Sequence, residues 1–174
     1  MIGTVPAGVK DLAFEFEVFV SVRLAEMARL ADPEQPADPA GFLREAELEA
    51  LLRRQFEAQR EAIRECFPGA RHEIVLYGDS PIGRMVTEET ASAVRLIDLA
   101  LIKPYRGLGI GSRLVRGLKR HAGQAGKPVK LTLQPDHPAL RLFLRQGFKL
   151  FGRTEDFLAL VWEPGVEELA AIAD

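Results

Sequence analysis

The chain has 174 residues, 47% of them hydrophobic, and its 23 basic and 25 acidic side chains leave a net charge of −2. This length suits one domain with its own core. A strong nucleic-acid binder is normally basic, so the charge balance disfavours that class. No segment approaches the roughly 18 to 20 apolar residues of a membrane span, and residues 1–14 do not resemble a secretion signal. We therefore expect a cytoplasmic protein with no membrane or nucleic-acid partner.

The first part of the chain predicts one strand and two helices. Residues 14–22 alternate apolar and polar side chains at their start and are rich in Val and Phe, which favours a strand, and residues 23–30 favour a short helix. Three prolines within residues 32–39 exclude regular structure and predict a loop. Apolar residues then recur at helical spacing from 42 to 66, before a Pro-Gly pair ends the helix. Cys66, the single cysteine, falls on the apolar stripe of this helix, so we expect it to be buried.

The second part of the chain alternates strands and helices. The expected elements, in chain order, are strands at 72–77, 82–87 and 94–102, a helix from 110 to 122 with Ile110, Leu114, Leu118 and Ala122 on one face, a strand at 129–133, a helix at 138–146, strands at 149–153 and 157–162, and a small acidic C-terminal turn or helix. A strand, helix and strand in succession imply a parallel crossover, whereas hairpins are antiparallel. The sheet should therefore be mixed.

Residues 102–113 join a predicted strand to a predicted helix through a glycine-rich turn. Gly107, Gly109 and Gly111 place no Cβ at the helix mouth, where several backbone N–H groups lack an intrahelical acceptor. The helix dipole favours an anion at this position, and Arg106 adds a cation beside it. The turn therefore predicts a phosphate-binding site.

Other phosphate-binding loops fit this turn less well. A nucleoside triphosphate loop has Lys before Ser or Thr, but Ser112 and Arg113 follow Gly111 directly. A dinucleotide fingerprint has an acidic residue about 20 positions later, where this chain has Lys130 and Leu131. Nucleotide binding through the glycine turn remains an alternative, and it predicts ATP or NAD affinity that CoA does not displace.

Three motifs, in order, resemble the GNAT superfamily of acyl-CoA-dependent N-acetyltransferases, as in its bacterial single-domain members. They are the strand and Arg-Gly-Leu-Gly-Ile-Gly loop at 96–111, the strand Gly-Lys-Pro-Val-Lys-Leu-Thr-Leu at 126–133, and the segment 137–148, which ends in Gly-Phe. The resemblance implies a single domain over residues 1–174 with its core at about 14–164. It also implies a mixed α/β fold, with a mainly antiparallel sheet of six to seven strands, a splayed central strand pair and about four helices.

The resemblance further implies acetyl-CoA as the cofactor. The pantetheine arm would bond to the exposed backbone of Leu99, Ala100 and Leu101, and one of these N–H groups, assigned to Leu101, would stabilise the oxyanion of the reaction. The pyrophosphate would lie on N–H groups from Arg106, Gly107, Leu108, Gly109, Ile110, Gly111 and Ser112.

Two positions depart from the family pattern. His137 replaces an asparagine that commonly contacts the cofactor, and Phe143 replaces a tyrosine that often protonates the departing thiolate. Phenylalanine cannot donate a proton, and a missing general acid costs about 10² to 10⁴ in rate. Another group or water would serve, the thiolate would leave unassisted, or the domain would bind acyl-CoA without turnover.

Several polar residues have both a functional and a structural interpretation. Asp98 is the candidate base for the amine proton, or it bonds to backbone or to Arg95. His137 contacts the cofactor or carries a proton, or it begins a helix. Tyr105 replaces the missing acid, or its ring packs at the edge of the loop. Four cations of the loop's helix attract the cofactor's 3′-phosphate or form a solvated face: Arg113, Arg116, Lys119 and Arg120.

The expected function is transfer of an acetyl group from acetyl-CoA to a primary amine of a small molecule or peptide, by direct attack in a ternary complex. The competing class is a non-catalytic acyl-CoA-binding regulatory module, for which Phe143 is the main argument. In the GNAT fold the acceptor is contacted by the first two helices, here joined by loop 32–41, and by the turn at 154–156, whose acids would favour a cationic acceptor. The last two strands are candidates for pairing in a homodimer.

Overall fold

The computed structural model describes residues 1–30 and 45–165. These residues fall into two compact units. Unit 1 comprises Met1–Pro68, His72–Arg84 and Ala100–Tyr105, and unit 2 comprises Gly69–Arg71, Met85–Leu99 and the chain from Arg106 onward. Three strands, β2, β3 and β4, contribute residues to both units.

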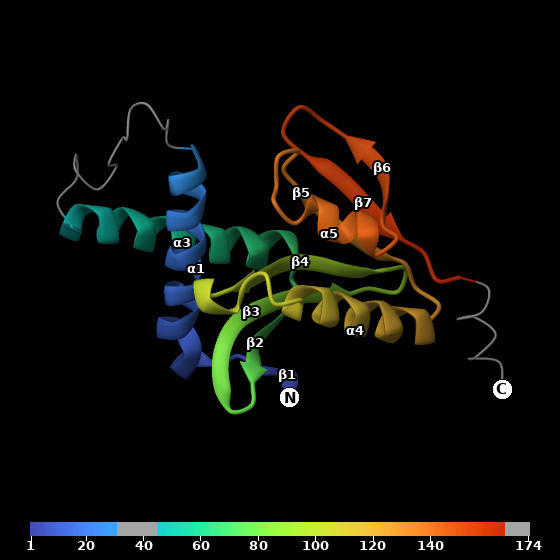
Figure 1. The fold of residues 1–174 in the computed structure, drawn as a ribbon, viewed down its shortest axis with the longest axis horizontal. Coiled ribbons are helices and arrows are strands. Elements are labelled where there is room, and N and C mark those ends of the chain that lie inside the picture. The colour runs from blue at the N-terminus through green and yellow to red at the C-terminus, as the bar shows by residue number, and fades with distance from the viewer. Residues whose placement is uncertain (31–44, 166–174) are drawn as a thin grey trace. The chain divides into compact units, whose positions relative to one another are not determined.

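The order of elements is a strand, two helices, three strands, a helix, a strand, a helix and two strands (Figure 1). The elements are β1 (Ile2–Pro6), α1 (Leu12–Leu30), α3 (Glu45–Cys66), β2 (Arg71–Tyr77), β3 (Ser80–Glu89), β4 (Val94–Leu101), α4 (Ile110–Gln124), β5 (Val129–Leu133), α5 (Leu140–Arg145), β6 (Lys149–Arg153) and β7 (Leu158–Trp162), with one-turn 3₁₀ helices at Val9–Asp11 and Lys103–Tyr105. Among residues 1–30 and 45–165, no helix combines the length and apolar character needed to cross a membrane.

The strands form one seven-stranded sheet in the order β1-β2-β3-β4-β5-β7-β6. β1 pairs antiparallel with β2, and β7 pairs antiparallel with both β5 and β6. β4 and β5 are parallel, as the crossover through α4 requires. The expectation of a mixed, mainly antiparallel sheet of six to seven strands with about four helices is confirmed.

The predicted strand at 14–22 is wrong, because these residues lie inside α1. Apolar and polar residues alternate at the start of this segment, which predicts a period of two, but Glu15, Val18 and Phe19 are buried at the spacing of a helix. Phe19 packs with Leu52 and Phe56 of α3. Packing between the two helices thus outweighs the strand preference of these residue types. The short helix expected at 23–30 is the second half of α1.

The first strand of the chain is β1, which the sequence pattern did not reveal. Its five residues pair with β2 from Ile2 opposite Tyr77 to Pro6 opposite Glu73. The side chain of Thr4 donates a hydrogen bond of 2.8 Å to Glu73. β1 lies at the edge of the sheet, where a proline at the strand end is tolerated. The predicted order of elements is therefore correct, although its first strand was assigned to the wrong residues.

Unit 1 has an aromatic core between α1 and α3, which lie against each other in Figure 1. The ring centroid of Phe56 lies 5.5 Å from those of Phe16 and Phe19, and the rings are tilted. Such tilted pairs are the favourable arrangement for aromatic side chains. The expected helix at 42–66 is confirmed over 45–66, whereas residues 42–44 and the proline-rich loop lie outside the described residues.

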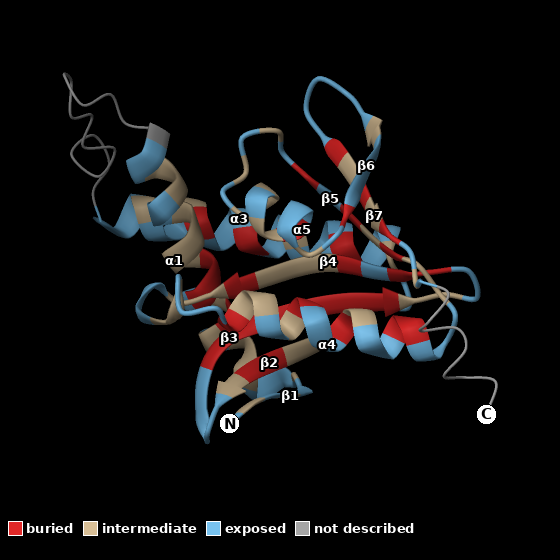
Figure 2. Ribbon diagram, turned by 45° about the vertical axis from the view of Figure 1, so that its right-hand side comes forward, coloured by how far each residue is buried: buried red, intermediate tan, exposed pale blue. Residues whose placement is uncertain are grey.

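Unit 2 has its core on one face of α4 and on the strands beside it. Ile110, Leu118 and Ala122 of α4 are buried, as predicted, and Leu114 is half-buried. Burial also alternates along β7, where Leu158, Leu160 and Trp162 are buried and the residues between them are half-buried (Figure 2). This alternation shows that one face of β7 is covered and the other is more open.

Cys66 is exposed, so the expectation that it is buried is wrong. It is the last residue of α3, and Phe67, Pro68 and Gly69 follow it. The last buried residue of the helix is Ile63, one turn earlier. The apolar stripe therefore ends before Cys66.

The end of β3 is bound to the end of α4 through Glu89. Lys127 Nζ lies 2.7 Å from Glu89 Oε1, and His121 Nε2 lies 2.8 Å from Glu89 Oε2. The hydrogen bonds from Lys127 and then His121 lower the pKa of Glu89 from 4.5 to about 2. A lowered folded-state pKa means that this carboxylate stabilises the fold above its unfolded-state pKa. That stability is lost as pH falls toward 2.

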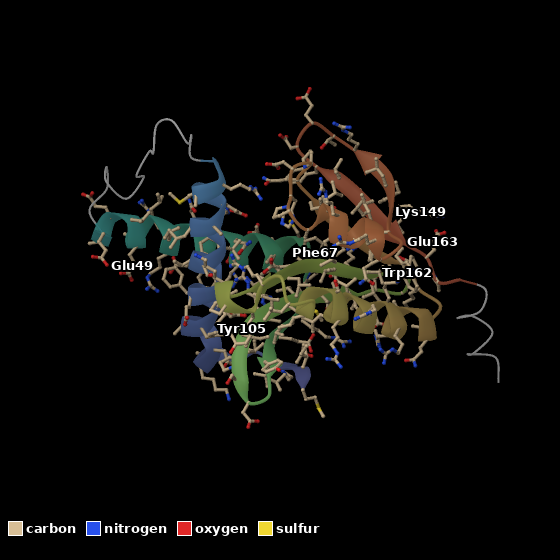
Figure 3. All side chains as sticks on the ribbon, viewed as in Figure 1. Glu49, Phe67, Tyr105, Lys149, Trp162 and Glu163 are labelled. Atoms are coloured by element: carbon tan, nitrogen blue, oxygen red, sulfur yellow. The ribbon has the colours of Figure 1, made fainter. Side chains whose placement is uncertain are left out.

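We expect Glu89→Gln to lower the free energy of unfolding by about 1 to 2 kcal/mol at pH 7. The neutral amide loses the ion pairs with Lys127 and His121, and solvent screening keeps the loss small. Urea unfolding between pH 7 and pH 3 measures the difference from wild type, which should narrow below about pH 4.5. Glu49→Gln is the control, since Glu49 forms an exposed pair with Arg53 on α3 (Figure 3) and should change little. A difference that stays constant with pH would contradict the electrostatic role of Glu89.

Candidate functional site

The parallel strands β4 and β5 separate soon after they begin to pair. Among the described residues their pairing runs from Val94 opposite Val129 to Leu96 opposite Leu131. β5 continues its pairing with β7 as far as Leu133, while β4 extends to Leu101. The edge of β4 that faced β5 therefore carries backbone groups beyond Leu96 that β5 does not pair. An open strand edge of this kind is a template for an extended ligand.

The glycine-rich turn of unit 2 leads into α4, and the N-terminus of this helix has no side-chain cap. Gly107 and Gly109 have φ angles of 75° and 76°, which residues other than glycine rarely adopt. Gly109 is the N-cap, and none of the described side chains caps this helix. The N–H of Arg113 makes the first helical bond, to the Gly109 carbonyl at 3.1 Å. The N–H groups before Arg113 are thus oriented for an anion.

The third glycine has a different role from the first two. A Cβ on Gly107 or Gly109 would meet nothing within 4 Å, so backbone conformation alone requires glycine at these positions. A Cβ on Gly111 would lie 3.6 Å from Leu142 of α5, in ordinary contact. Leu108, between the first two glycines, is 67% exposed. The surface above the turn is therefore open, while its helix packs against α5.

Gln146 and Lys119 join α4 to the end of α5. The Gln146 side chain donates a 3.3 Å hydrogen bond to the Ser112 carbonyl, and Lys119 Nζ donates one of 2.8 Å to the Gln146 carbonyl. The Lys119 ammonium also lies 4.8 Å from the ring centroid of Trp162. Lys119 thus contacts the protein interior, and among the four cations proposed for a 3′-phosphate, Arg113, Arg116 and Arg120 are the exposed ones.

In unit 1 the end of β4 is closely approached by Gly83 of β3. A Cβ on Gly83 would overlap the Ala100 carbonyl oxygen and would lie 3.0 Å from the Leu101 Cα. The N–H of Ile102 donates a 2.9 Å hydrogen bond to the Ile82 carbonyl. Glycine is therefore required at position 83 for β3 to come this close to Ala100 and Leu101.

Residues 26–148 match the family model described as Acetyltransferase (GNAT) family, which is more than half of the 174 residues. The chain belongs to the GNAT acetyltransferase family. Comparison with curated protein sequences gave no match.

Solved structures of GNAT proteins have the same fold. The PaiA N-acetyltransferase from Thermoplasma acidophilum in complex with coenzyme A is 15% identical, with a TM-score of 0.68 over 94% of this chain and 99% of that one. An acetyltransferase from Thermus thermophilus is 16% identical, with a TM-score of 0.62 over 94% and 97%. The PseH N-acetyltransferase from Campylobacter jejuni in complex with acetyl coenzyme A is 13% identical, with a TM-score of 0.56 over 95% and 100%.

The two positions that depart from the GNAT pattern lie on either side of the start of α5. The Nδ1 atom of His137 accepts a 3.1 Å hydrogen bond from the Ala139 N–H, and its carbonyl accepts one of 3.0 Å from the Leu140 N–H. This geometry supports the role of His137 in beginning the helix. Phe143 is buried, and its ring meets that of Phe148 edge-on at 5.4 Å. Phe143 therefore forms part of the core of unit 2.

The candidate base Asp98 and its possible structural partner Arg95 both lie on β4 of this GNAT protein. Asp98 and Leu99 of β4 are half-buried. Arg95 of the same strand donates a 2.8 Å hydrogen bond to buried Glu88, which also accepts one of 3.3 Å from the Gly69 N–H. Arg95 and Glu88 thus form a structural ion pair.

Tyr105 is half-buried, and its ring centroid lies 6.1 Å from that of Tyr77 (Figure 3). This contact between rings agrees with the structural interpretation of Tyr105 at the edge of the loop. The turn at 154–156 is exposed, and the Thr154 N–H closes it with a 2.8 Å hydrogen bond to the Phe157 carbonyl. The loop at 32–41 lies outside the described residues.

Gly83 of unit 1 and Gln146 of unit 2 are two residues that the sequence pattern did not single out. A glycine inside a predicted strand is a weak signal for close backbone approach, which is the role of Gly83. The contact of Gln146 with Ser112 joins residues 34 positions apart, and no local pattern reveals it.

We expect Gly83→Ala to lower the free energy of unfolding by at least ~2 kcal/mol, because the methyl group would overlap backbone that cannot move aside easily. Gly3→Ala is the matched control, since a Cβ there meets nothing within 4 Å of the edge strand β1. Chemical denaturation of both variants measures the difference. Equal stability of the two variants would contradict the requirement for glycine at position 83.

Proposed function

We propose that this GNAT protein transfers an acetyl group from acetyl-CoA to a primary amine by direct attack in a ternary complex. The proposal rests on the uncapped N-terminus of α4 behind the two left-handed glycines, Gly107 and Gly109. N–H groups converging at such a position bind phosphate oxygens through hydrogen bonds and the helix dipole. The complexes of PaiA with coenzyme A and PseH with acetyl coenzyme A support the same cofactor class.

The residues present fit the parts of acetyl-CoA. The pyrophosphate would be held by backbone N–H groups from Arg106 to Ser112. A Cβ added to Gly107 or Gly109 would meet no atom within 4 Å, so there is open space beside these two residues. The pantetheine arm would add as an extended segment along the open edge of β4, at Leu99, Ala100 and Leu101. Backbone groups make both sets of interactions, so they depend on backbone conformation more than on side-chain identity.

The chemistry then requires one bond to form and one to break. The amine nitrogen attacks the thioester carbonyl carbon, and the C–S bond breaks to release the CoA thiolate. The Leu101 N–H would stabilise the oxyanion, which in comparable sites contributes a few kcal/mol. Asp98 would accept the amine proton, directly or through water. Phe143 cannot supply the proton that the thiolate needs, so in this proposal water supplies it.

The second candidate function is a non-catalytic acyl-CoA-binding module with a regulatory role. The observation in its favour is the burial of Phe143 against Phe148 at the position of the family's tyrosine. Both functions predict binding of acetyl-CoA. They differ only in turnover.

Incubation with acetyl-CoA and a panel of small-molecule and peptide amines tests the two functions. Release of free thiol that depends on the amine supports the transferase, and mass spectrometry of the product locates the new amide. Calorimetry with CoA measures binding separately. Tight binding without turnover across the panel would favour the module, and absence of binding would contradict both.

We expect Gly109→Ala to weaken CoA binding at least ~10-fold, because an L-residue at φ 76° costs about 1 to 2 kcal/mol and displaces the N–H groups of the turn. Gly117→Ala in the same helix is the matched control, since a Cβ there meets nothing within 4 Å and φ is not in the left-handed region. This control should bind CoA normally and gain about 0.5 to 1 kcal/mol of stability. Equal affinities for CoA would contradict the assignment of the turn.

We expect Phe143→Tyr to raise kcat at least ~10-fold with little change in the KM for acetyl-CoA, because it supplies a proton donor where protonation by water limits the rate. Phe148→Tyr is the control, since it adds the same hydroxyl to the ring that packs against Phe143. Steady-state assays with the best amine of the panel make the comparison. A kcat that does not rise would show that protonation of the thiolate is not limiting.

A further inference from the structure

The basic side chains of this chain are concentrated in unit 2. Residues 106–149 contain ten Lys or Arg and a single acid, Asp136, although the net charge of the whole chain is −2. The charge of this segment is therefore opposite in sign to that of the remaining chain. Such an uneven distribution bears on the choice of partner rather than on the fold, and it favours an anionic partner.

Three of these cations form a stripe along α4. Arg113, Arg116 and Arg120 are exposed, and their spacing in sequence places them on one side of the helix. Arg113 and Arg120 are about 10 Å apart along the helix axis. The stripe begins beside the glycine turn, because the N–H of Arg113 bonds to the Gly109 carbonyl. A positive surface thus extends from the turn along α4.

The exposed side of α5 adds two arginines beside the start of α4. Arg141 and Arg145 are exposed, and Leu144, which precedes Arg145, is 48% exposed. Gln146, the next residue, bonds to the Ser112 carbonyl, so this end of α5 lies against the first turn of α4. We call the combined set the arginine face: Arg113, Arg116, Arg120, Arg141, Leu144 and Arg145.

The cations of the arginine face differ from those of unit 1 in their surroundings. Within the part of the chain that the structure describes, none of the five guanidinium groups of this face pairs with a carboxylate. α4 and α5 themselves contain no acid. On α3, by contrast, Arg53 pairs with Glu49 one turn away, as on an ordinary solvated helix that mixes both signs. The arginine face is therefore available to acidic groups of another molecule.

Free CoA would use only part of this surface. Its 3′-phosphate carries at most about two negative charges, whereas the face has five arginines on two helices. A phosphate group also provides no apolar contact for Leu144, or for Leu108 in the glycine turn, which is 67% exposed. Arginines around apolar side chains are typical of a protein interface. The surface thus suits an acidic protein better than a small anion.

We propose that the arginine face binds an acidic carrier protein that presents the acyl group on a phosphopantetheine arm. The inference rests on the proposed acetyl transfer and replaces the nucleotide part of the donor with a protein. In such a donor the phosphate joins pantetheine to a serine of the carrier. With this phosphate on the N–H groups of the glycine turn, the carrier surface around the serine would meet Leu108 and the arginine face, which begins one helical turn after Gly109.

The transfer is the same as with acetyl-CoA apart from the leaving group. The amine nitrogen forms the new C–N bond, the thioester C–S bond breaks, and the amine proton passes to Asp98 or to water. The pantetheine thiolate stays attached to the carrier and takes a proton from water. No oxidant, reductant or further reactant is required.

A nucleic acid fits the arginine face less well than an acidic protein does. The exposed positions of α4 and α5 carry no Phe, Tyr or Trp on which a base could stack, since Phe143 is buried. The phosphates of a duplex would bind the arginines but would leave Leu108 and Leu144 without apolar contacts. An acidic protein offers carboxylates, which accept paired N–H bonds from guanidinium groups, together with apolar side chains.

Calorimetry at low salt tests the inference, with an acidic acyl carrier protein acetylated on its phosphopantetheine arm as the probe. We expect a Kd of about 1 to 100 μM that rises with added salt. The double variant Arg141→Glu, Arg145→Glu should raise this Kd at least ~10-fold, because like charges then meet across the interface. The same variant should leave the Kd for CoA unchanged.

Two controls isolate the arginine face. The double variant Lys10→Glu, Arg54→Glu makes the same change in net charge at exposed residues of unit 1 and should leave both Kd values unchanged. Leu144→Ser removes an apolar contact without changing the charge and should raise the Kd for the carrier at least ~3-fold. Circular dichroism verifies folding of each variant.

Amine-dependent acetyl transfer from the two donors completes the test. The Arg141→Glu, Arg145→Glu variant should lower kcat/KM for the acetylated carrier at least ~10-fold and leave that for acetyl-CoA unchanged. Three results would overturn the inference alone: binding of CoA without binding of the carrier, an equal loss in the unit 1 control, or tighter binding of a DNA duplex than of the carrier. Absence of CoA binding would contradict the proposed function, whatever the result with the carrier.

Discussion

The early separation of β4 from β5 is the constraint on which the rest of the candidate site depends. Backbone N–H and C=O groups in a sheet interior normally pair, and beyond Leu96 β4 no longer pairs with β5. The turn before α4 is a second feature of this kind, because Gly109 begins the helix without a side-chain cap. In the proposed function, an extended amide-rich arm would pair along β4 and a phosphate group would bind at the turn.

The parts of the structure that the sequence predicted correctly are those that local chemistry determines. The φ angles of Gly107 and Gly109 follow from steric rules that apply within one residue. The alternation of Val129, Leu131 and Leu133 with polar residues determines which side of β5 is buried. The glycine turn and its helix could therefore be located, and their relation to the GNAT family could be recognised, without any knowledge of tertiary contacts.

The parts that the sequence did not predict depend on contacts between distant residues. Residues 14–22 have strand-forming side chains, yet burial of Phe19 against Leu52 and Phe56 makes them helical. Gly83 is required by the approach of Ala100 and Leu101, and Gln146 matters because Ser112 lies beside it. None of these relations leaves a periodic pattern in the chain.

In the candidate site, backbone groups are proposed to bind the cofactor and side chains to transfer protons. This difference explains why binding is easier to assign than catalysis. The groups proposed to hold the cofactor are backbone groups from Leu99 to Leu101 and from Arg106 to Ser112. They persist through side-chain substitution as long as Gly83, Gly107 and Gly109 preserve the conformation. Proton transfer has no backbone substitute, because it requires a titratable group. Phenylalanine instead of tyrosine at position 143 would therefore lower turnover without weakening the binding of the cofactor.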